Sequence, residues 1–287
     1  MKPLGLWRFA TFVDDHDGLV SSDLPGLRIA TSGGHVVRSY KELLKKVAAL
    51  GYHNPRFKLL FRGQTRDYKL NTRGGPSPHS SLYPTILRAH PGVRRHQALD
   101  EAFARLVAAE KLVVERIREP AVHSQQLVRW AVLQHYGVCA TPLLDVSGSL
   151  QTALSFASEG TTEGFVFVLA FPQTAGPLSV SLESMTQVID LSQSCPPEAL
   201  RPHFQSAMLV GDYPAIVNRE TSHGRRGMIG NNFACRLLAK FHLTHCTEWL
   251  IEGFTATPQR ILFPNDADEW FGILSGISDD ISGRHAA

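Results

Sequence analysis

Apolar residues recur at helical spacing in several segments of the chain, and each of these segments is predicted to form a helix. The predicted helices cover residues 39–50, 99–117, 124–136, 150–157 and a segment after Asn265. The first of them has the ends of a well-defined helix, because Ser39 and Glu42 form the S-x-x-E pattern of a capping box and Gly51 follows as a stop.

Continuous apolar runs between these segments predict strands, of which residues 164–171 are the clearest. Further strands are expected before Arg62 and at 187–191, 206–210 and 233–238, whereas residues 71–81 are rich in Gly, Pro and Ser and predict a loop. Helices precede, interrupt and follow the strands without regular strand-helix alternation. We therefore expect an α+β fold with a single mixed, mostly antiparallel sheet flanked by helices.

Composition is that of a globular protein, with 287 residues of which 43% are apolar and 19% are charged. No run of about 18 apolar residues appears and no secretory signal precedes the first strand, so we expect neither membrane association nor export. Four separated cysteines without a C-x-x-C pair indicate reduced thiols and a cytoplasmic protein. These are Cys139, Cys195, Cys235 and Cys246. The net charge of +3 is too small to imply a nucleic-acid partner by itself.

An apolar run at 57–61 leads directly into Arg62, Gly63 and Gln64, and this is the sharpest candidate for a site. A guanidinium held at a strand end offers forked donors that match phosphate oxygens. Gly63 would let a ligand approach the backbone closely, and Gln64 would either orient Arg62 or bind the ligand. The structural alternative is that Arg62 is a buried clamp paired with Asp145.

Two further groups of polar residues are candidates for the same site. His135 and Tyr136 end a predicted helix just before Gly137, where side chains can project into a cleft. Asp145 and Ser147 precede the helix at 150–157 and would serve as its caps, as site residues, or as both. As a site residue Asp145 would orient Arg62 or His135, and the helix start would offer N–H groups to a phosphate.

A basic segment, 218–232, contains Arg219, Arg225 and Arg226 among glycines. Such a segment is either a solvated surface loop or a substrate-binding loop that steers a nucleic acid by its phosphates.

Other chemistries find little support in the sequence. The C-x6-H-x2-H-C arrangement at 235–246 lacks the spacing of structural zinc sites, so we expect core packing there and no metal. The chain has no G-x-S-x-G elbow, P-loop or G-x-G-x-x-G, which argues against a serine hydrolase, a P-loop NTPase and a Rossmann dehydrogenase. A nuclease would need clustered carboxylates, and no convincing cluster is present.

Several separated motifs resemble one family, the FRG domain proteins, named for the Phe-Arg-Gly found at 61–63. The resemblance continues in SLYPTILR at 81–88, in LQHYGVCATPLLDVSGSLQTALSFA at 133–157, in RPHFQSAMLVGDYP at 201–214 and in LIEGFTATPQRILFPNDADEW at 250–270. It implies an FRG domain at 39–277, an amino-terminal extension at 1–38 and a flexible tail at 278–287. Pro142 and Val146 stand where the family has arginine and tryptophan, which leaves the activity or the substrate class open.

The order of motifs is also similar, more weakly, to the split sheet of NAD-using ADP-ribosyltransferases, which implies NAD as substrate and no metal. On this likeness Arg62 would bind a phosphate or ribose of NAD, and His135 and Tyr136 would hold the nicotinamide half. The implied catalytic residues are Arg62, His135, Tyr136, Asp145 and Gln205, and the implied NAD contacts are Arg62, Gly63, Gln64, His135, Tyr136, Thr141 and Ser147.

Gln205 lies where such a transferase usually has a glutamate that supplies negative charge in the transition state. Glu159, Glu163 or Asp145 would have to replace that charge, or the reaction differs, or catalysis is absent. The implied function is ADP-ribosyl transfer to DNA, RNA or a nucleotide, by a bacterial toxin or phage-defence effector that a neutralising antitoxin would bind. The alternative is a non-catalytic module that binds a nucleotide or a protein partner.

Overall fold

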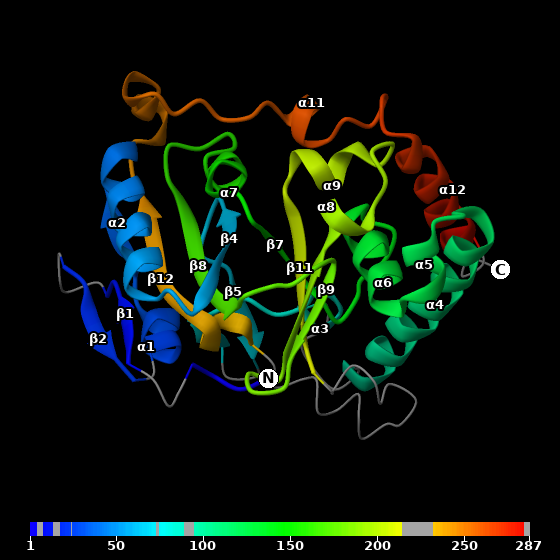
Figure 1. Cartoon of the computed structure of the whole chain (residues 1–287), viewed down its shortest axis with the longest axis horizontal. Coiled ribbons are helices and arrows are strands. Elements are labelled where there is room, and N and C mark those ends of the chain that lie inside the picture. Colours follow the sequence, from blue (N-terminus) through cyan, green and yellow to red (C-terminus); the bar gives the residue numbers. More distant parts are fainter. Residues whose placement is uncertain are drawn as a thin grey trace.

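One large sheet organises the chain in the computed structural model, which describes residues 1–4, 8–13, 18–23, 25–72, 75–88, 95–213 and 232–283. Within these ranges eight strands pair in the order β3-β12-β8-β4-β7-β11-β10-β9 (Figure 1). They are β3 (His35–Val37), β4 (Phe57–Gln64), β7 (Leu144–Ser147), β8 (Gly164–Pro172), β9 (Leu178–Ser181), β10 (Thr186–Asp190), β11 (Ala207–Asp212) and β12 (Leu237–Leu243). All neighbours are antiparallel except β3 and β12. The predicted α+β fold with a mixed, mostly antiparallel sheet is confirmed.

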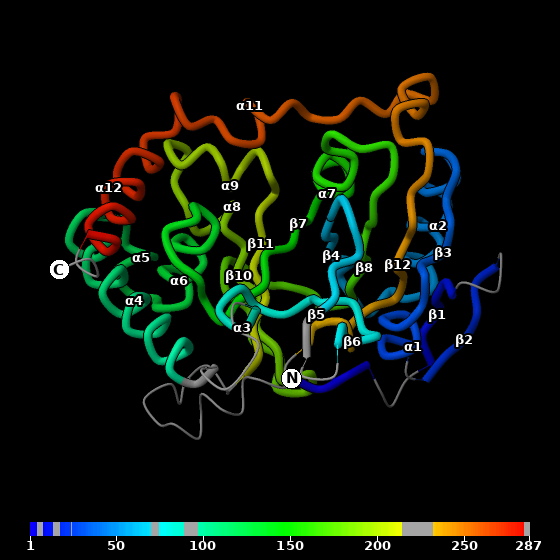
Figure 2. The backbone as a smooth tube through the Cα atoms, turned by 180° about the vertical axis from the view of Figure 1, so that it is seen from behind, coloured from blue at the N-terminus to red at the C-terminus, as the bar shows by residue number. Residues whose placement is uncertain are grey.

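Helices pack around this sheet. They are α1 (Pro25–Thr31), α2 (Tyr40–His53), α3 (Thr85–Arg88), α4 (Arg95–Arg116), α5 (Pro120–Ser124), α6 (Gln126–His135), α7 (Leu150–Ala157), α8 (Leu191–Ser194), α9 (Leu200–Phe204), η1 (Phe233–Arg236), η2 (Cys246–Glu252), α11 (Gln259–Leu262) and α12 (Glu269–Gly283). The α4, α5, α6 and α12 helices gather beyond the β9–β11 end, and α2 lies beside β12 (Figure 1). The connection from η2 through α11 to α12 passes over one end of the strands, as both views show (Figure 2).

Capping explains where α2 begins and ends. The Ser39 hydroxyl accepts a hydrogen bond from the Glu42 N–H at 3.1 Å, as the capping pattern predicts, although the Glu42 carboxylate reaches the N–H of Arg38 rather than that of Ser39. The predicted stop at Gly51 is wrong, because the helix continues to His53. The side-chain amide of Asn54 then donates to the Leu50 carbonyl and satisfies part of the helix end.

Three other boundaries differ from the prediction. The predicted loop at 71–81 contains a two-stranded ribbon of β5 (Lys69–Thr72) and β6 (Gly75–Ser80), where prolines are tolerated because one edge needs no N–H donor. The predicted helix at 124–136 is interrupted by an extended residue, Gln125, which separates α5 from α6. The predicted strand at 233–238 begins as η1 and becomes β12 only at Leu237.

The described amino-terminal residues pack against the sheet. A separate ribbon pairs β1 (Phe9–Thr11) with β2 (Val20–Ser22), and Phe9 and Phe12 are buried in the same core as α2 and α7. β3 adds an edge strand parallel to β12. At the other end of the chain α12 continues past residue 277 to Gly283, and its Ile281 is buried.

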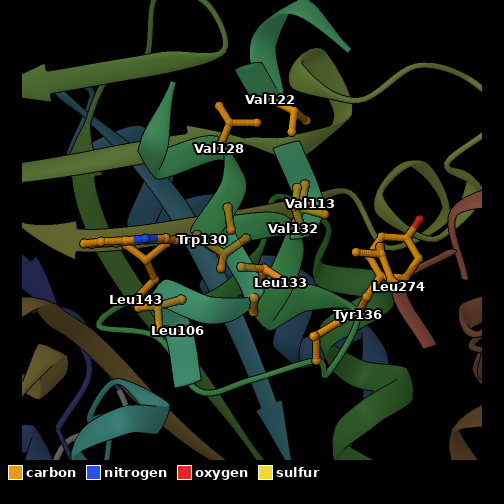
Figure 3. Packing of buried hydrophobic residues seen from close by; sticks show 14 of the residues in the cluster. Leu106, Val113, Val122, Val128, Trp130, Val132, Leu133, Tyr136, Leu143 and Leu274 are labelled. Atoms are coloured by element: carbon orange, nitrogen blue, oxygen red, sulfur yellow. The ribbon is translucent and has the colours of Figure 1, made fainter. Parts of the chain in front are cut away.

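Apolar side chains form two helical cores. One core lies between α4, α5, α6 and α12, with Trp130, Leu133 and Leu274 among its buried members (Figure 3). The other core packs α2 and α7 onto β8 and β12. A third cluster, which includes residues of β4, β7, β8, β10 and β11, joins strands from both ends of the sheet.

The middle of the sheet is split between β4 and β7. These two strands share a single paired position, Phe61 with Ser147, whereas β4 is paired with β8 along its whole length. The predicted arginine-bearing strand therefore borders an interruption of the backbone ladder.

Candidate functional site

A cavity of about 680 Å³ opens at the split between β4 and β7, a volume in the range of small-molecule sites. Four consecutive residues of β4, from Phe61 to Gln64, line it. Because successive strand residues point to opposite faces, a cavity lined by all four enters the gap in the sheet rather than lying on one face. The predicted residues Arg62, Gly63, Gln64, His135, Asp145, Ser147 and Gln205 all line this cavity.

Arg62 bridges the split. Its Nη1 donates a 2.6 Å hydrogen bond to the backbone carbonyl of Asp145, so this side chain joins β4 to β7 where backbone pairing between the two strands is missing. Arg62 is thus clamped to Asp145, as the structural alternative predicts, but through the backbone carbonyl oxygen of Asp145 and not through its carboxylate. Burial lowers the pKa of Arg62, and the Asp145 carboxylate opposes that shift. Nε of Arg62 is buried and has no hydrogen-bond partner within the described ranges, which leaves a donor for a ligand.

Gly63 is required by helix packing. A Cβ at this position would lie 1.7 Å from the carbonyl oxygen of Ala153 in α7. The equivalent atom at Gly164 on the neighbouring strand β8 would lie 2.1 Å from the Ala157 carbonyl oxygen. The close approach predicted at Gly63 is therefore explained by α7, not by a ligand.

Asp145 lies at the centre of a buried hydrogen-bond chain. Its Oδ2 accepts a 2.6 Å bond from the Gln134 amide, and the Gln134 Oε1 accepts from the hydroxyl of Thr141. Thr141 is fully buried and does not line the cavity. Its hydroxyl orients Gln134, so the predicted direct contact of Thr141 with NAD has no counterpart in this geometry.

His135 and Asp145 form a pair in which the imidazole is neutral at neutral pH. The Nδ1 of His135 lies 3.6 Å from Oδ1 of Asp145. Burial lowers the pKa of His135 more than the neighbouring carboxylate raises it. Burial alone would raise the pKa of Asp145, but contacts with His135, Gln134 and Arg62 outweigh it and lower that pKa. The result is a charged carboxylate beside an uncharged ring whose Nε2 has no partner among the described residues.

Tyr136 points away from the cavity. Its hydroxyl donates a 2.8 Å bond to Oδ2 of Asp268, and its ring belongs to the helical core (Figure 3). Burial and the nearby Asp268 carboxylate raise its pKa. The adjacent positions 135 and 136 thus face different surroundings, and the predicted stacking of Tyr136 on a nicotinamide ring does not follow from the structure.

Ser147 and Gln205 meet at the far side of the split. The Ser147 hydroxyl donates a 2.7 Å bond to the Gln205 carbonyl, while the Gln205 side-chain amide donates to the Leu262 carbonyl. Gln205 precedes β11 instead of lying within a strand. The predicted capping of α7 by Asp145 or Ser147 is wrong, because both belong to β7 and Ser149 is the capping residue.

Sequence reasoning missed two arginines that line the cavity. Nε of Arg88 donates a 2.6 Å bond to the Tyr83 carbonyl, and burial together with repulsion from Arg62 lowers its pKa to about 9, so it stays charged at neutral pH. The Arg201 guanidinium lies over the ring of Phe263, 4.5 Å from its centroid. Both arginines belong to segments that carry the FRG resemblance, at 81–88 and 201–214, and that was the available signal.

Positive charge concentrates in this cavity, together with buried polar atoms that make no hydrogen bond to any described residue. Arg62, Arg88 and Arg201 line it together with two carboxylates, Asp145 and Glu159. Buried polar atoms are usually paired, and each exception needs an explanation. Among the described residues, five atoms of this kind belong to residues that line the cavity: Arg62 Nε, Gln64 Oε1, His135 Nε2, Asp145 Oδ1 and Arg201 Nε. Such a set fits a polar, anionic ligand.

The remaining candidates either fall outside the described residues or do not line the cavity. Arg219, Arg225 and Arg226 fall outside the described residues. Glu163 is 3.3 Å from His242 and does not line the cavity. Across the described ranges, no group of three His, Cys, Asp or Glu residues is placed to hold a metal ion. No helix in the described part of the chain combines the length and apolarity needed to cross a bilayer.

Comparison with known proteins identifies one part of the chain. No curated protein and no solved structure matches it. Residues 58–164 match the family model of the FRG domain, and this segment supplies Arg62, His135 and Asp145 to the cavity. The chain therefore contains an FRG domain.

Proposed function

We propose that the cavity binds NAD and that the protein transfers ADP-ribose from it to a nucleic acid or nucleotide. The observation that carries the proposal is the convergence of Arg62, Arg88 and Arg201 on one cavity that also holds five buried polar atoms without a hydrogen bond to any described residue. A pyrophosphate offers two negative charges and several acceptor oxygens, which match guanidinium donors in charge and geometry.

The cavity offers the proposed ligand an aromatic surface as well as a basic one. Phe156 of α7 and Phe263 after α11 both line the cavity, with ring centroids 6.0 Å apart. Arg201 lies over Phe263 and adds a planar cation to this wall. A nucleotide ring would stack on this wall while its phosphates reach Arg62 and Arg88.

The reaction breaks the bond between C1′ of the ribose and the nicotinamide nitrogen. Nicotinamide leaves with the bonding electron pair, and an oxygen or nitrogen of the acceptor forms the new bond to C1′ and gives up its proton. His135 is the base for that proton, because its ring is neutral and the Asp145 carboxylate offsets part of the burial that disfavours the imidazolium. The carboxylates of Asp145 and Glu159 stabilise positive charge that develops on the ribose. The Gln205 amide cannot supply that charge.

The test combines binding and turnover. Calorimetry with NAD should show binding to the purified protein, and chromatography should show nicotinamide release when DNA, RNA, nucleotide or lysate is added. Arg88→Gln should weaken NAD binding about tenfold or more, since a charge-assisted phosphate contact is lost. Arg116→Gln is the matched control, because Arg116 is paired with Asp280 on the surface and does not line the cavity. Absence of both NAD binding and nicotinamide release would refute the proposal.

A second candidate is a non-catalytic module that binds a nucleotide or a protein partner. It is favoured by Gln205, whose amide is held by the Leu262 carbonyl and which provides no carboxylate. Growth separates the two candidates, because a transferase that acts as a toxin or phage-defence effector should arrest cells that express it. Arg88→Gln should relieve the arrest, whereas a binding module should leave growth unchanged in both forms.

A further inference from the structure

Tyr68 is an exposed aromatic residue at the cavity that the proposed NAD site leaves unused. It lies on the connection from β4 to β5, lines the cavity, and is 42% exposed. The Arg66 guanidinium lies over its ring, 4.7 Å from the centroid. An exposed tyrosine with a planar cation on its ring is a ready surface for stacking a further planar group.

Positive charge surrounds this tyrosine. Lys69 and Arg88 line the same cavity, and Arg66 is exposed next to it. The nearby carboxylate, Asp67, is shared between two lysines, with its Oδ2 2.8 Å from Nζ of Lys69 and 3.0 Å from Nζ of the buried Lys240. Two lysines thus face one carboxylate, so these three groups together carry a net charge of +1, to which Arg66 adds a further positive charge.

We infer that Tyr68 stacks one base of a single-stranded nucleic acid whose phosphates lie along Arg66 and Lys69. Aromatic side chains in a basic groove bind single strands in this way, and a duplex cannot present a base for stacking without being opened. The stacked base lies where the cavity meets the surface. That this base is the acceptor of ADP-ribose rests on the proposed function. That Tyr68 binds a base does not.

Fluorescence anisotropy with a labelled dT12 oligonucleotide tests the inference, with a duplex of equal length for comparison. The wild-type protein should prefer the single strand. Tyr68→Ala should weaken its binding about 5- to 100-fold, and Tyr68→Trp should retain it. Tyr52→Ala is the matched control, because Tyr52 is 80% exposed on α2 and does not line the cavity. Arg66→Gln should reduce the slope of log affinity against log salt by about 0.7, the value for one phosphate contact on a single strand.

Each outcome separates this inference from the proposed function. Equal binding by Tyr68→Ala and wild type, or preference for the duplex, overturns the inference. So does a Tyr68→Ala protein that loses NAD affinity but keeps its oligonucleotide affinity, because the ring would then serve the adenine of NAD. Oligonucleotide binding that depends on Tyr68, in a protein that neither binds NAD nor releases nicotinamide, supports the inference and refutes the transferase.

Discussion

Replacing Gly63 by alanine tests how α7 is seated on the sheet. The added Cβ would lie 1.7 Å from the Ala153 carbonyl oxygen, 2.7 Å from its carbonyl carbon and 3.0 Å from the Ala157 nitrogen. An ordinary contact begins near 3.4 Å, so α7 must move away from β4 by roughly 1.7 Å. The obstacle is the backbone of α7 itself, and no side-chain rotation relieves it. We expect a loss at the upper end of the range for overpacked cores, about 3 kcal/mol in the free energy of unfolding.

Urea denaturation and thermal melting followed by circular dichroism measure this loss. A destabilisation of that size should lower the melting temperature by about 5 to 10 °C. Gly272→Ala is the control, because Gly272 is exposed within α12 and an added Cβ meets nothing within 4 Å. That variant should gain about 0.5 to 1 kcal/mol from helix propensity. If Gly63→Ala is as stable as the wild type, the packing account of this glycine is incorrect.

Three further predictions concern the residues around the split. Burial lowers the pKa of His135 in the folded protein below its ordinary value near 6.5, so the unfolded chain binds a proton more readily. The free energy of unfolding should therefore fall by up to about 1.4 kcal/mol per pH unit below about pH 6.5. Urea titrations from pH 5 to 8 should show this component vanish in His135→Gln, and identical slopes would contradict it. Tyr136→Phe should cost about 1 to 3 kcal/mol because Asp268 loses a buried donor, while calorimetry should show unchanged NAD affinity; weaker NAD binding would return Tyr136 to the site. Arg62→Ala should cost a similar amount in chemical denaturation, because the Asp145 carbonyl loses its partner, and an unchanged midpoint would show that Arg62 does not hold the split.

Features encoded locally were predictable from the sequence. The Phe-Arg-Gly motif was identified as part of a site because its polar end interrupts an apolar run, and the structure places Arg62 at the cavity. The cap of α2 at Ser39 and the apolar stripe of α7 follow from spacing alone. These signals depend on neighbours within a few residues, which is why they survive without knowledge of the fold.

Features that depend on tertiary packing were not predictable in the same way. The end of α6 does not reveal that His135 faces the split while Tyr136 turns toward Asp268. Arg88 and Arg201 are separated by more than a hundred residues, so their convergence appears only once α3 and α9 are placed around the sheet. The need for glycine at position 63 was anticipated, but the group that approaches it was not, since α7 is distant in sequence.

Because β4 and β7 share a single paired position, we expect the sheet to yield most easily at its centre. Four strands lie on each side of this seam, and residues from both sides meet in the cavity: Arg62 and Gln64 from one side, Asp145 and Gln205 from the other. A ligand that contacts both sides would take the place of the missing backbone hydrogen bonds between β4 and β7. Occupancy should therefore slow amide hydrogen exchange in the strands that flank the seam, so that rigidity of the two halves and affinity for the ligand rise together.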